Sequence, residues 1–250
     1  MNQPIIRHVA PIFRETGHQQ LGFSGSAVLI DGPNGSPWLV SAAHVLAEMD
    51  HAQIVVAAVA GAYYYLVAEG KILSTCELTP LEAAQDQKDL AFVRLHPTIA
   101  ESLRRADFKF LSLEQIDLGE SRPLAEPCIL DGYPRQFVEM DEGRPRHLLE
   151  MRTKSVLLPD ADVAKRFKLK ADLHLVSPFT ALRDETGKPM KTPDPDGMSG
   201  GAIWTLWPEG NRLAGIIIEH DRHRREIVGS RIGPLVRELR RRASSPKASP

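Results

Sequence analysis

The stretch from Asp196 to Trp204 holds one serine among three glycines, followed at once by an apolar run (Asp196-Gly197-Met198-Ser199-Gly200-Gly201-Ala202-Ile203-Trp204). Glycine permits the positive φ angles of tight turns and lets another segment approach the backbone closely. The apolar residues that follow are typical of a buried strand that anchors the turn. The Ser199 hydroxyl would then stand on a rigid support, with the amides of Gly197 and Ser199 directed toward one point. Such a turn suits a nucleophile beside an oxyanion hole.

A serine nucleophile needs an imidazole to accept its proton and a carboxylate to fix the tautomer of that imidazole. His44 follows the apolar residues 38–41, at a junction between a strand and a helical turn. Asp89 ends the polar loop 85–89 and abuts the apolar run 90–95, which would bury it beside His44. Each candidate therefore lies at an end of a β element, and the three together predict acyl-transfer chemistry.

Taken alone, each of these residues has a simpler interpretation. A Gly-Ser run is most often a turn between strands, and a lone histidine among apolar residues usually bonds to backbone in the core. An aspartate in a loop is usually solvated, and Asp86 competes with Asp89 for the orienting role. The interpretation as a site gains weight because a base, an orienter and a nucleophile occur in one chain.

Short apolar runs separated by turn residues make up most of the chain. We expect strands at residues 5–13, 21–30, 38–41, 53–59, 63–73, 90–95, 128–134, 147–158, 172–179, 202–204, 213–218 and 226–232. Apolar spacing predicts a closing helix at 232–242, and residues 160–170 have a charged, helical composition. No long helices alternate with the strands, so the pattern predicts an all-β barrel or sandwich.

Composition limits the classes of function. The 250 residues include 31 basic and 32 acidic side chains, so net charge favours neither nucleic acid nor a membrane as partner. The N-terminus lacks the order of a secretory signal and no apolar run reaches membrane-spanning length, which predicts a cytoplasmic protein. Cys76 and Cys128 stand far apart, and two buried thiols are favoured over a disulfide. Neither zinc spacing nor a phosphate-binding loop occurs, so we expect no metal and no cofactor.

Three blocks of the chain resemble a known family. They are Ser41-Ala42-Ala43-His44-Val45, Lys88-Asp89-Leu90-Ala91-Phe92-Val93-Arg94-Leu95 and Gly197-Met198-Ser199-Gly200-Gly201-Ala202. They look like the signature blocks of trypsin-like serine peptidases with the chymotrypsin fold, here of the bacterial intracellular type. The order His, Asp, Ser matches that family and not the subtilisin or α/β-hydrolase orders. The resemblance covers roughly residues 20 to 240.

The resemblance implies two antiparallel six-stranded β-barrels, with the site between them and a C-terminal helix. We assign residues 1–110 to an N-terminal lobe, 111–243 to a C-terminal lobe with the helix, and 244–250 to a disordered tail. His44 and Asp89 would come from the first lobe and Ser199 from the second, with Gly197 and Ser199 supplying the oxyanion-hole amides. The residues expected to bind substrate are Asp196, Ile218, Glu219 and His220. Met198 replaces the aspartate that precedes the serine in the digestive enzymes, so packing, substrate or a partner, rather than a freed N-terminus, should order this loop.

The leading hypothesis is a serine endopeptidase that cleaves protein or peptide substrates through an acyl-enzyme on Ser199. One alternative is a catalytically silent module that keeps the fold and holds peptides in the cleft. Another is a regulatory effector whose proteolysis is gated by a protein partner. The carboxylates of Glu219 and Asp196 suggest a basic side chain in the substrate, whereas His220 would equally favour an acidic one.

Overall fold

The computed structural model describes residues 7–17, 20–47, 54–57, 63–65, 73–74, 89–119, 122, 124–166, 168–179 and 193–244. The strands are β1 (Val9–Gly17), β2 (Gln20–Asp31), β3 (Pro37–Ala42), β4 (Ile54–Ala57), β5 (Tyr63–Tyr65), β6 (Leu73–Ser74), β7 (Leu90–Arg94), β8 (Leu111–Ser112), β9 (Glu126–Gly132), β10 (Val138–Asp141), β11 (Arg144–Leu148), β12 (Met151–Leu157), β13 (His174–Pro178), β14 (Ala202–Thr205), β15 (Arg212–Asp221) and β16 (Glu226–Arg231). The helices are α1 (Ala43–Leu46), α3 (Pro97–Arg105), α4 (Asp160–Val163) and α5 (Gly233–Ser244). The chain is thus mostly β, as the sequence predicts.

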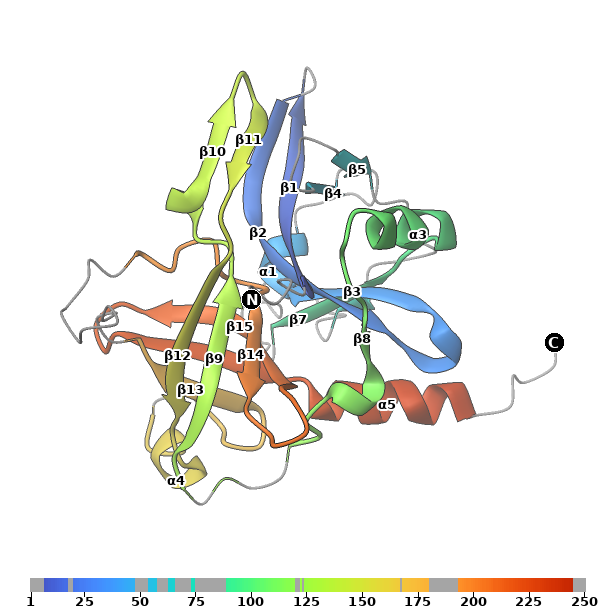
Figure 1. The fold of residues 1–250 in the computed structure, drawn as a ribbon. Coiled ribbons are helices and arrows are strands. Elements are labelled where there is room, and N and C mark those ends of the chain that lie inside the picture. The colour runs from blue at the N-terminus through green and yellow to red at the C-terminus, as the bar shows by residue number, and fades with distance from the viewer. Residues whose placement is uncertain are drawn as a thin grey trace.

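The first sheet contains eight strands in the order β5-β4-β1-β2-β3-β7-β6, with β8 beside β2. All of its pairings are antiparallel except that of β8 with β2. β1 and β2 form a long ribbon, and the hairpin β10–β11 runs alongside it (Figure 1). The amide of Leu21 joins these two hairpins by donating to the carbonyl of Gly143 at 2.7 Å.

The second sheet contains six strands in the order β12-β9-β14-β15-β16-β13, and every pairing is antiparallel. It curls until its two edge strands approach each other. The amide of Leu158 donates to the carbonyl of Val176 at 2.9 Å, and the Ser155 hydroxyl donates to the carbonyl of Pro178 at 2.7 Å. No ladder closes either sheet within the described residues, so the structure shows a curled half-barrel and not the two closed barrels that we predict.

One hydrophobic core joins the two sheets. Val28 and Val40 of the first sheet belong to the same buried cluster as Trp204 and Ile216 of the second. The cluster also takes in Leu235 and Val236 of α5 and Ile232 just before this helix. Because apolar side chains from both sheets remove one another from water at interior packing density, this core fixes how the sheets sit together. A site built from both sheets depends on that fixed relation.

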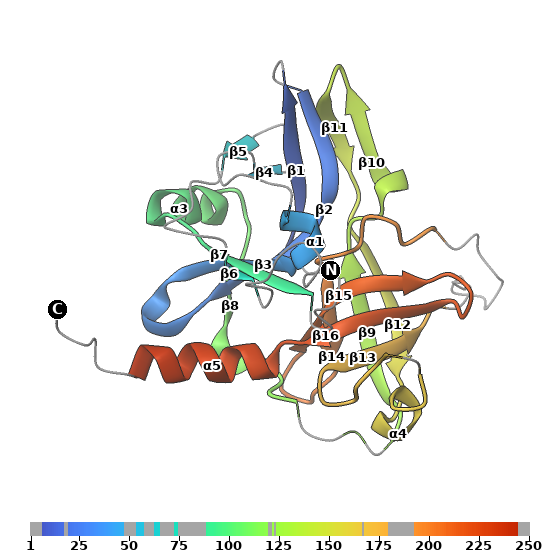
Figure 2. The ribbon, with the colours of Figure 1, turned by 180° about the vertical axis from the view of Figure 1, so that it is seen from behind.

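Two segments that we assign to the second lobe contact the first sheet. β8 begins just after the predicted boundary at 110 and pairs with β2. α5 runs beneath the first sheet in both ribbon views (Figure 1 and Figure 2), and Arg240 donates to the carbonyl of Leu113 at 3.1 Å. α5 includes Ser244, where we expect the tail to begin, and residues 245–250 lie outside the described ranges.

Several predicted element limits are wrong. β1 begins at Val9 and not at residue 5, and α4 covers only the start of the predicted helix at 160–170. The predicted strand at 147–158 is two strands, because β11 pairs with β10 whereas β12 pairs with β9. Within the predicted strand at 63–73, the structure shows β5 and the first residue of β6. The middle of this range lies outside the described residues.

No helix within the described ranges is both long and apolar enough to cross a membrane. Cys128 is a buried free thiol on β9, and its burial raises the pKa of the thiol to about 11. A thiol in this setting stays protonated and unreactive at neutral pH. Cys76 lies outside the described residues, so its predicted burial stays a prediction.

Candidate active site

His44 and Asp89 lie together at one end of the first sheet. β3 pairs with β7 so that Ala42 faces Leu90, which brings the start of α1 next to the start of β7. The His44 ring donates from Nδ1 to Asp89 Oδ2 at 2.6 Å, and the His44 amide donates to Asp89 Oδ1 at 3.0 Å. Both carboxylate oxygens of Asp89 thus accept hydrogen bonds from His44. The ring bond fixes the tautomer that leaves Nε2 free to accept a proton.

Asp89 holds an unusual backbone conformation. Its φ angle is 44°, in the left-handed region that residues other than glycine seldom adopt. Its carbonyl accepts from the amide of Ala43 at 2.8 Å while its carboxylate holds His44. Three hydrogen bonds to two successive residues therefore maintain this conformation. Strained residues of this kind concentrate at functional sites.

The surroundings of His44 favour its charged form. The hydrogen bond with Asp89 raises the pKa of His44 above its ordinary value, partial burial opposes the rise, and the charges of Asp89 and Glu219 add to it. The His44 side chain is 51% exposed, so its free face remains open to substrate. An imidazole in this environment would hold a proton taken from a hydroxyl group more strongly than a free imidazole does.

The segment 195–201 consists of two consecutive turns, closed by backbone hydrogen bonds of 2.9 and 2.8 Å. The third residue of each turn is a glycine with positive φ, 91° at Gly197 and 86° at Gly200, as type II turns require. A Cβ atom at position 200 would also lie 1.8 Å from the carbonyl oxygen of Ser26. Glycine is therefore needed there for both conformation and close approach. These nucleophile turns (195–201) place Ser199 at the corner of the second turn.

Ser26, on β2 of the first sheet, ties the nucleophile turns to the rest of the molecule. It is fully buried, its amide donates to the Ser199 carbonyl at 2.8 Å, and its hydroxyl donates to the Gly197 carbonyl at 3.2 Å. The same hydroxyl accepts from the amide of Tyr133 at 3.0 Å. The Ser26 carbonyl accepts from the Ser41 hydroxyl at 2.7 Å. The position of Ser199 therefore depends on the first sheet as well as the second.

Met198 and β15 hold the nucleophile turns on the side of the second sheet. Met198 is fully buried, and a Cβ atom on Gly132 would lie 3.3 Å from the Met198 Cβ. The amide of Gly200 donates to the Ile217 carbonyl at 2.7 Å, and the Ile217 amide donates to the Gly201 carbonyl at 2.8 Å. Apolar packing and backbone bonds thus fix this loop, with no charged partner at position 198.

The amides of Gly197 and Ser199 differ from those of their neighbours. The amides at positions 196, 198, 200 and 201 each donate to an acceptor in the protein. Those of Gly197 and Ser199 have no acceptor among the described residues. Two unpaired N–H groups therefore lie in the same loop as the Ser199 hydroxyl. An oxyanion is the kind of acceptor that such a pair of donors suits.

Gly25 lies between the two halves of the candidate site. A Cβ atom on Gly25 would lie 2.8 Å from the Ser199 carbonyl oxygen and 3.0 Å from a methyl group of Val45, the residue after His44. The nucleophile turns and α1 thus approach each other across a strand with no side chain between them. Within the described part of the chain, no hydrogen bond joins the Ser199 hydroxyl to His44. The structure pairs His44 with Asp89 and brings Ser199 near them, but it does not pair the serine with the histidine.

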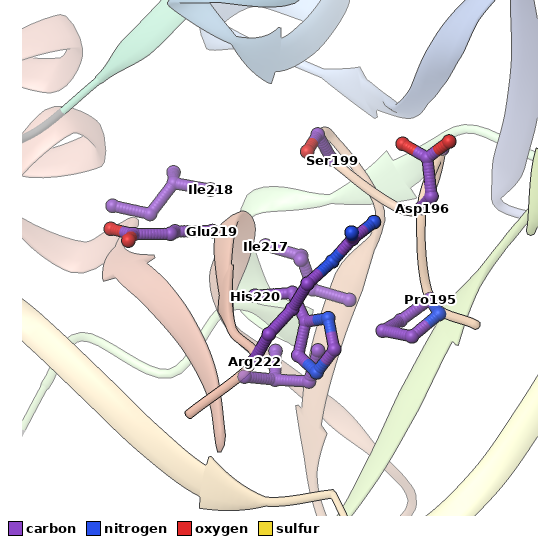
Figure 3. Close-up of a pocket in the computed structure, with 10 residues that line it drawn as sticks. Pro195, Asp196, Ser199, Ile217, Ile218, Glu219, His220 and Arg222 are labelled. Carbon is purple, nitrogen blue, oxygen red and sulfur yellow. The ribbon is translucent and has the colours of Figure 1, made fainter. Parts of the chain in front are cut away.

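A pocket of about 250 Å³ opens beside Ser199 (Figure 3). The nucleophile turns and β15 supply most of its lining, and Arg222 after β15 and Ile227 of β16 complete it. The lining residues are Pro195, Asp196, Gly197, Ser199, Ile217, Ile218, Glu219, His220, Arg222 and Ile227. This lining includes all four residues that we expect to bind substrate, and their role stays a prediction. Sites for drug-sized ligands usually measure about 300–1,000 Å³, so this pocket suits a single side chain.

Three residues of the site were not predicted from the sequence. Ser26 lies in the run Gly25-Ser26-Ala27, where small side chains signal a close neighbour but not its identity. Arg135 donates from Nε to Asp196 Oδ2 at 3.0 Å, and Arg222 lines the pocket. Arginines in turns are common on surfaces and carry no comparable signal. Asp86, the competitor for the orienting role, lies outside the described residues.

No group of three metal-ligating side chains gathers anywhere in the described ranges. No protein-family model matches this chain, and no curated protein shows significant sequence similarity to it.

Proposed function

We propose that this chain is a serine endopeptidase that hydrolyses peptide bonds through an acyl-enzyme on Ser199. His44 is the general base, Asp89 orients it, and the amides of Gly197 and Ser199 form the oxyanion hole. The pocket beside Ser199 receives the side chain that precedes the cleaved bond. Proteins or peptides are the substrates, and no metal or cofactor takes part in these steps.

In the acylation step, Ser199 Oγ attacks the carbonyl carbon of the substrate while His44 Nε2 accepts the hydroxyl proton. Asp89 keeps Nδ1 protonated and stabilises the imidazolium that forms. The carbonyl oxygen becomes an anion that accepts hydrogen bonds from the amides of Gly197 and Ser199, which have no acceptor in the described part of the chain. The C–N bond then breaks as His44 returns the proton to the leaving amine.

In the deacylation step, a water molecule takes the place of the amine. His44 removes a proton from this water, which attacks the ester carbonyl carbon. The ester C–O bond breaks and Ser199 recovers its proton from His44. The hydrogen bond between Ser199 and His44 forms when substrate is bound, since catalytic hydrogen bonds are often long or absent in free enzymes.

The observation that carries the proposal is the pair of hydrogen bonds that Asp89 accepts from His44. Asp89 has a left-handed φ of 44° and accepts two hydrogen bonds from a single histidine. A carboxylate that only made the loop soluble would require neither feature. The arrangement maintains one tautomer of the half-exposed His44 ring. Base orientation of this kind is what an acyl-transfer site requires.

The same proposal includes the family resemblance. The order His44, Asp89, Ser199 along the chain, a base on one sheet and a nucleophile beside the other support membership of the trypsin-like peptidases. Under this proposal the two sheets correspond to the two barrels of that fold. The half-barrel curl of the second sheet supports this assignment.

A peptide-library digest tests the proposal. Wild-type protein should cleave internal peptide bonds, and Ser199→Ala should leave the library intact at equal concentration. Resistance of the library to wild-type protein, or equal cleavage by the variant, would rule out catalysis by Ser199.

The missing hydrogen bond between Ser199 and His44 favours a second candidate, a peptide-binding module without catalysis. In that case the library peptides bind wild-type protein and Ser199→Ala equally, and no new termini appear. Fluorescence anisotropy with a labelled peptide, followed by mass spectrometry of the same sample, separates the two candidates.

A further inference from the structure

The charge of Asp196, at the edge of the pocket beside Ser199, is already offset by Arg135. Arg135 Nε lies 3.0 Å from Asp196 Oδ2, and the Arg135 amide donates to the Asp196 carbonyl at 2.7 Å. Arg135 is held in turn by the carbonyl of Phe23, to which its guanidinium donates at 3.2 Å. Arg135 therefore competes with a substrate side chain for the carboxylate of Asp196.

Glu219 directs its carboxylate away from the centre of the pocket. In Figure 3 its side chain extends on the side of Ile218, away from Asp196 and from the guanidinium of Arg222. Its charge acts on His44, whose pKa it helps to raise. The two carboxylates that suggested a basic substrate side chain thus have other roles.

Arg222 turns its guanidinium group into the region between Ser199 and Asp196 (Figure 3). Among the described residues its hydrogen-bond partner is Asp194, at 3.4 Å. The two side chains are 70% and 52% exposed, and an exposed pair at this distance contributes little stability. A substrate carboxylate offering a bidentate contact would compete well for Arg222.

His220 adds a second donor at the same pocket. The ring of Phe179 lies edge-on to its imidazole, with the ring centres 5.9 Å apart, which limits its orientation. Burial lowers the pKa of His220 below its ordinary value, so the ring is neutral at pH 7 and offers one N–H. Ile217 and Ile227 supply the apolar part of the lining.

We propose that this pocket selects an acidic side chain, glutamate or aspartate, in the residue that precedes the cleaved bond, and that Arg222 determines this specificity. The inference rests on the proposed peptidase function. Arg222 supplies the charge, His220 supplies a second hydrogen bond, and the isoleucines contact the methylene groups. A basic preference would require Asp196 to leave Arg135 or Glu219 to turn inward.

The test measures kcat/KM for peptides that differ only in carrying Glu, Gln, Arg or Leu before the cleaved bond. The Glu peptide should exceed the Gln peptide by about 10- to 100-fold, as expected for hydrogen bonds to a charged group. Arg222→Gln should bring this ratio close to one, and Asp194→Asn should raise it. Arg224→Gln is the matched control, since Arg224 faces Asp221 in the same turn and does not line the pocket.

Equal rates for the Glu and Gln peptides, or faster cleavage after Arg or Leu, would overturn the proposal. A second arm measures binding of product peptides ending in Glu or Gln to Ser199→Ala by fluorescence anisotropy, which needs no turnover. Tighter binding of the Glu product, lost in the double variant with Arg222→Gln, is the expected result. If the peptidase proposal alone fails, no variant cleaves but this binding preference remains. If the specificity proposal alone fails, cleavage persists and the preference is absent in both arms.

Discussion

The two halves of the candidate site are held in different ways. The nucleophile turns lie between the sheets, with Met198 fully buried on one side and the buried Ser26 bonded to them on the other. The pair of His44 and Asp89 lies at one end of a single sheet, where their side chains are 51% and 25% exposed. That pair is held mainly by hydrogen bonds between Asp89 and the start of α1.

The two halves of the site thus owe their geometry to different interactions. Packing between sheets fixes where Ser199 and the free amides lie, so a change in the core should displace them without touching the histidine. Local bonding fixes the tautomer of His44, so a change at Asp89 should alter proton transfer without moving the serine. A substitution that damages one half of the site should therefore leave the other half intact, and the two can be measured separately.

Removing a reacting group should have the largest effect. We expect Ser199→Ala and His44→Ala each to lower kcat by about 10⁴-fold or more, because the two groups act as one unit in acylation. Thermal unfolding of Ser199→Ala should match the wild type, since Ser199 contributes its backbone, and not its hydroxyl, to the contacts of the turns. Turnover within tenfold of wild type in either variant would contradict the assignment.

Asp89→Asn should damage the histidine half alone, lowering kcat by about 10³- to 10⁴-fold. The base must be neutral, so kcat/KM falls as the pH falls through the pKa of His44. Asp89 raises that pKa, and its replacement should therefore move the acid limb of the profile to lower pH. An NMR titration of His44 in the Ser199→Ala background measures the same shift without turnover.

Asp86→Asn is the matched control for Asp89→Asn, because both change one aspartate of the same polar run of the sequence, 85–89. It should leave the rate and the pH profile close to those of the wild type. If Asp86→Asn proved the more damaging change, the orienting residue would be Asp86 and the account of this half would be wrong.

Ser26→Ala should damage the nucleophile half alone. It leaves the buried amide of Tyr133 and carbonyl of Gly197 without their hydroxyl partner, which costs about 1–3 kcal/mol of unfolding free energy. We expect kcat to fall with the pKa of His44 unchanged, as read from the acid limb of the pH profile. Ser24→Ala, two residues earlier on β2, serves as the control, and an equal loss there would remove Ser26 from its role.

Glu219→Gln should have the smallest effect. Its charge acts on His44 through space, so the acid limb should shift to lower pH by less than in Asp89→Asn. Salt should weaken this contribution, since Glu219 is exposed, and should leave the Asp89 contribution largely intact. An acid limb that does not respond to Glu219→Gln at low salt would show that Glu219 lies too far from His44 to matter.

The local elements of the site could be predicted from the sequence because their signals are local. The glycines of the nucleophile turns, the start of α1 after β3 and the loop before β7 each follow from neighbouring residue types. β3 and β7 pair so that Ala42 lies opposite Leu90, and this register brings His44 and Asp89 together.

The long-range parts could not be predicted in the same way. The bond of Ser26 to Gly197 and that of Arg135 to Asp196 join residues more than 60 positions apart, and no short pattern encodes them. The split between β11 and β12 could not be predicted because residues 147–152 include no glycine or proline where the chain changes partner strand. The partner of Asp196 could not be predicted for a related reason, since a carboxylate in the sequence does not show which arginine faces it.

A fluorophosphonate probe tests the central claim most directly, because it reacts with a hydroxyl only where a base and an oxyanion hole act together. Ser199 Oγ should displace fluoride from phosphorus, giving a stoichiometric adduct that peptide mapping locates on Ser199. His44→Ala should suppress this labelling and Arg224→Gln should not. An unlabelled Ser199 in the folded wild-type protein, or an adduct on another residue that survives Ser199→Ala, would contradict the account.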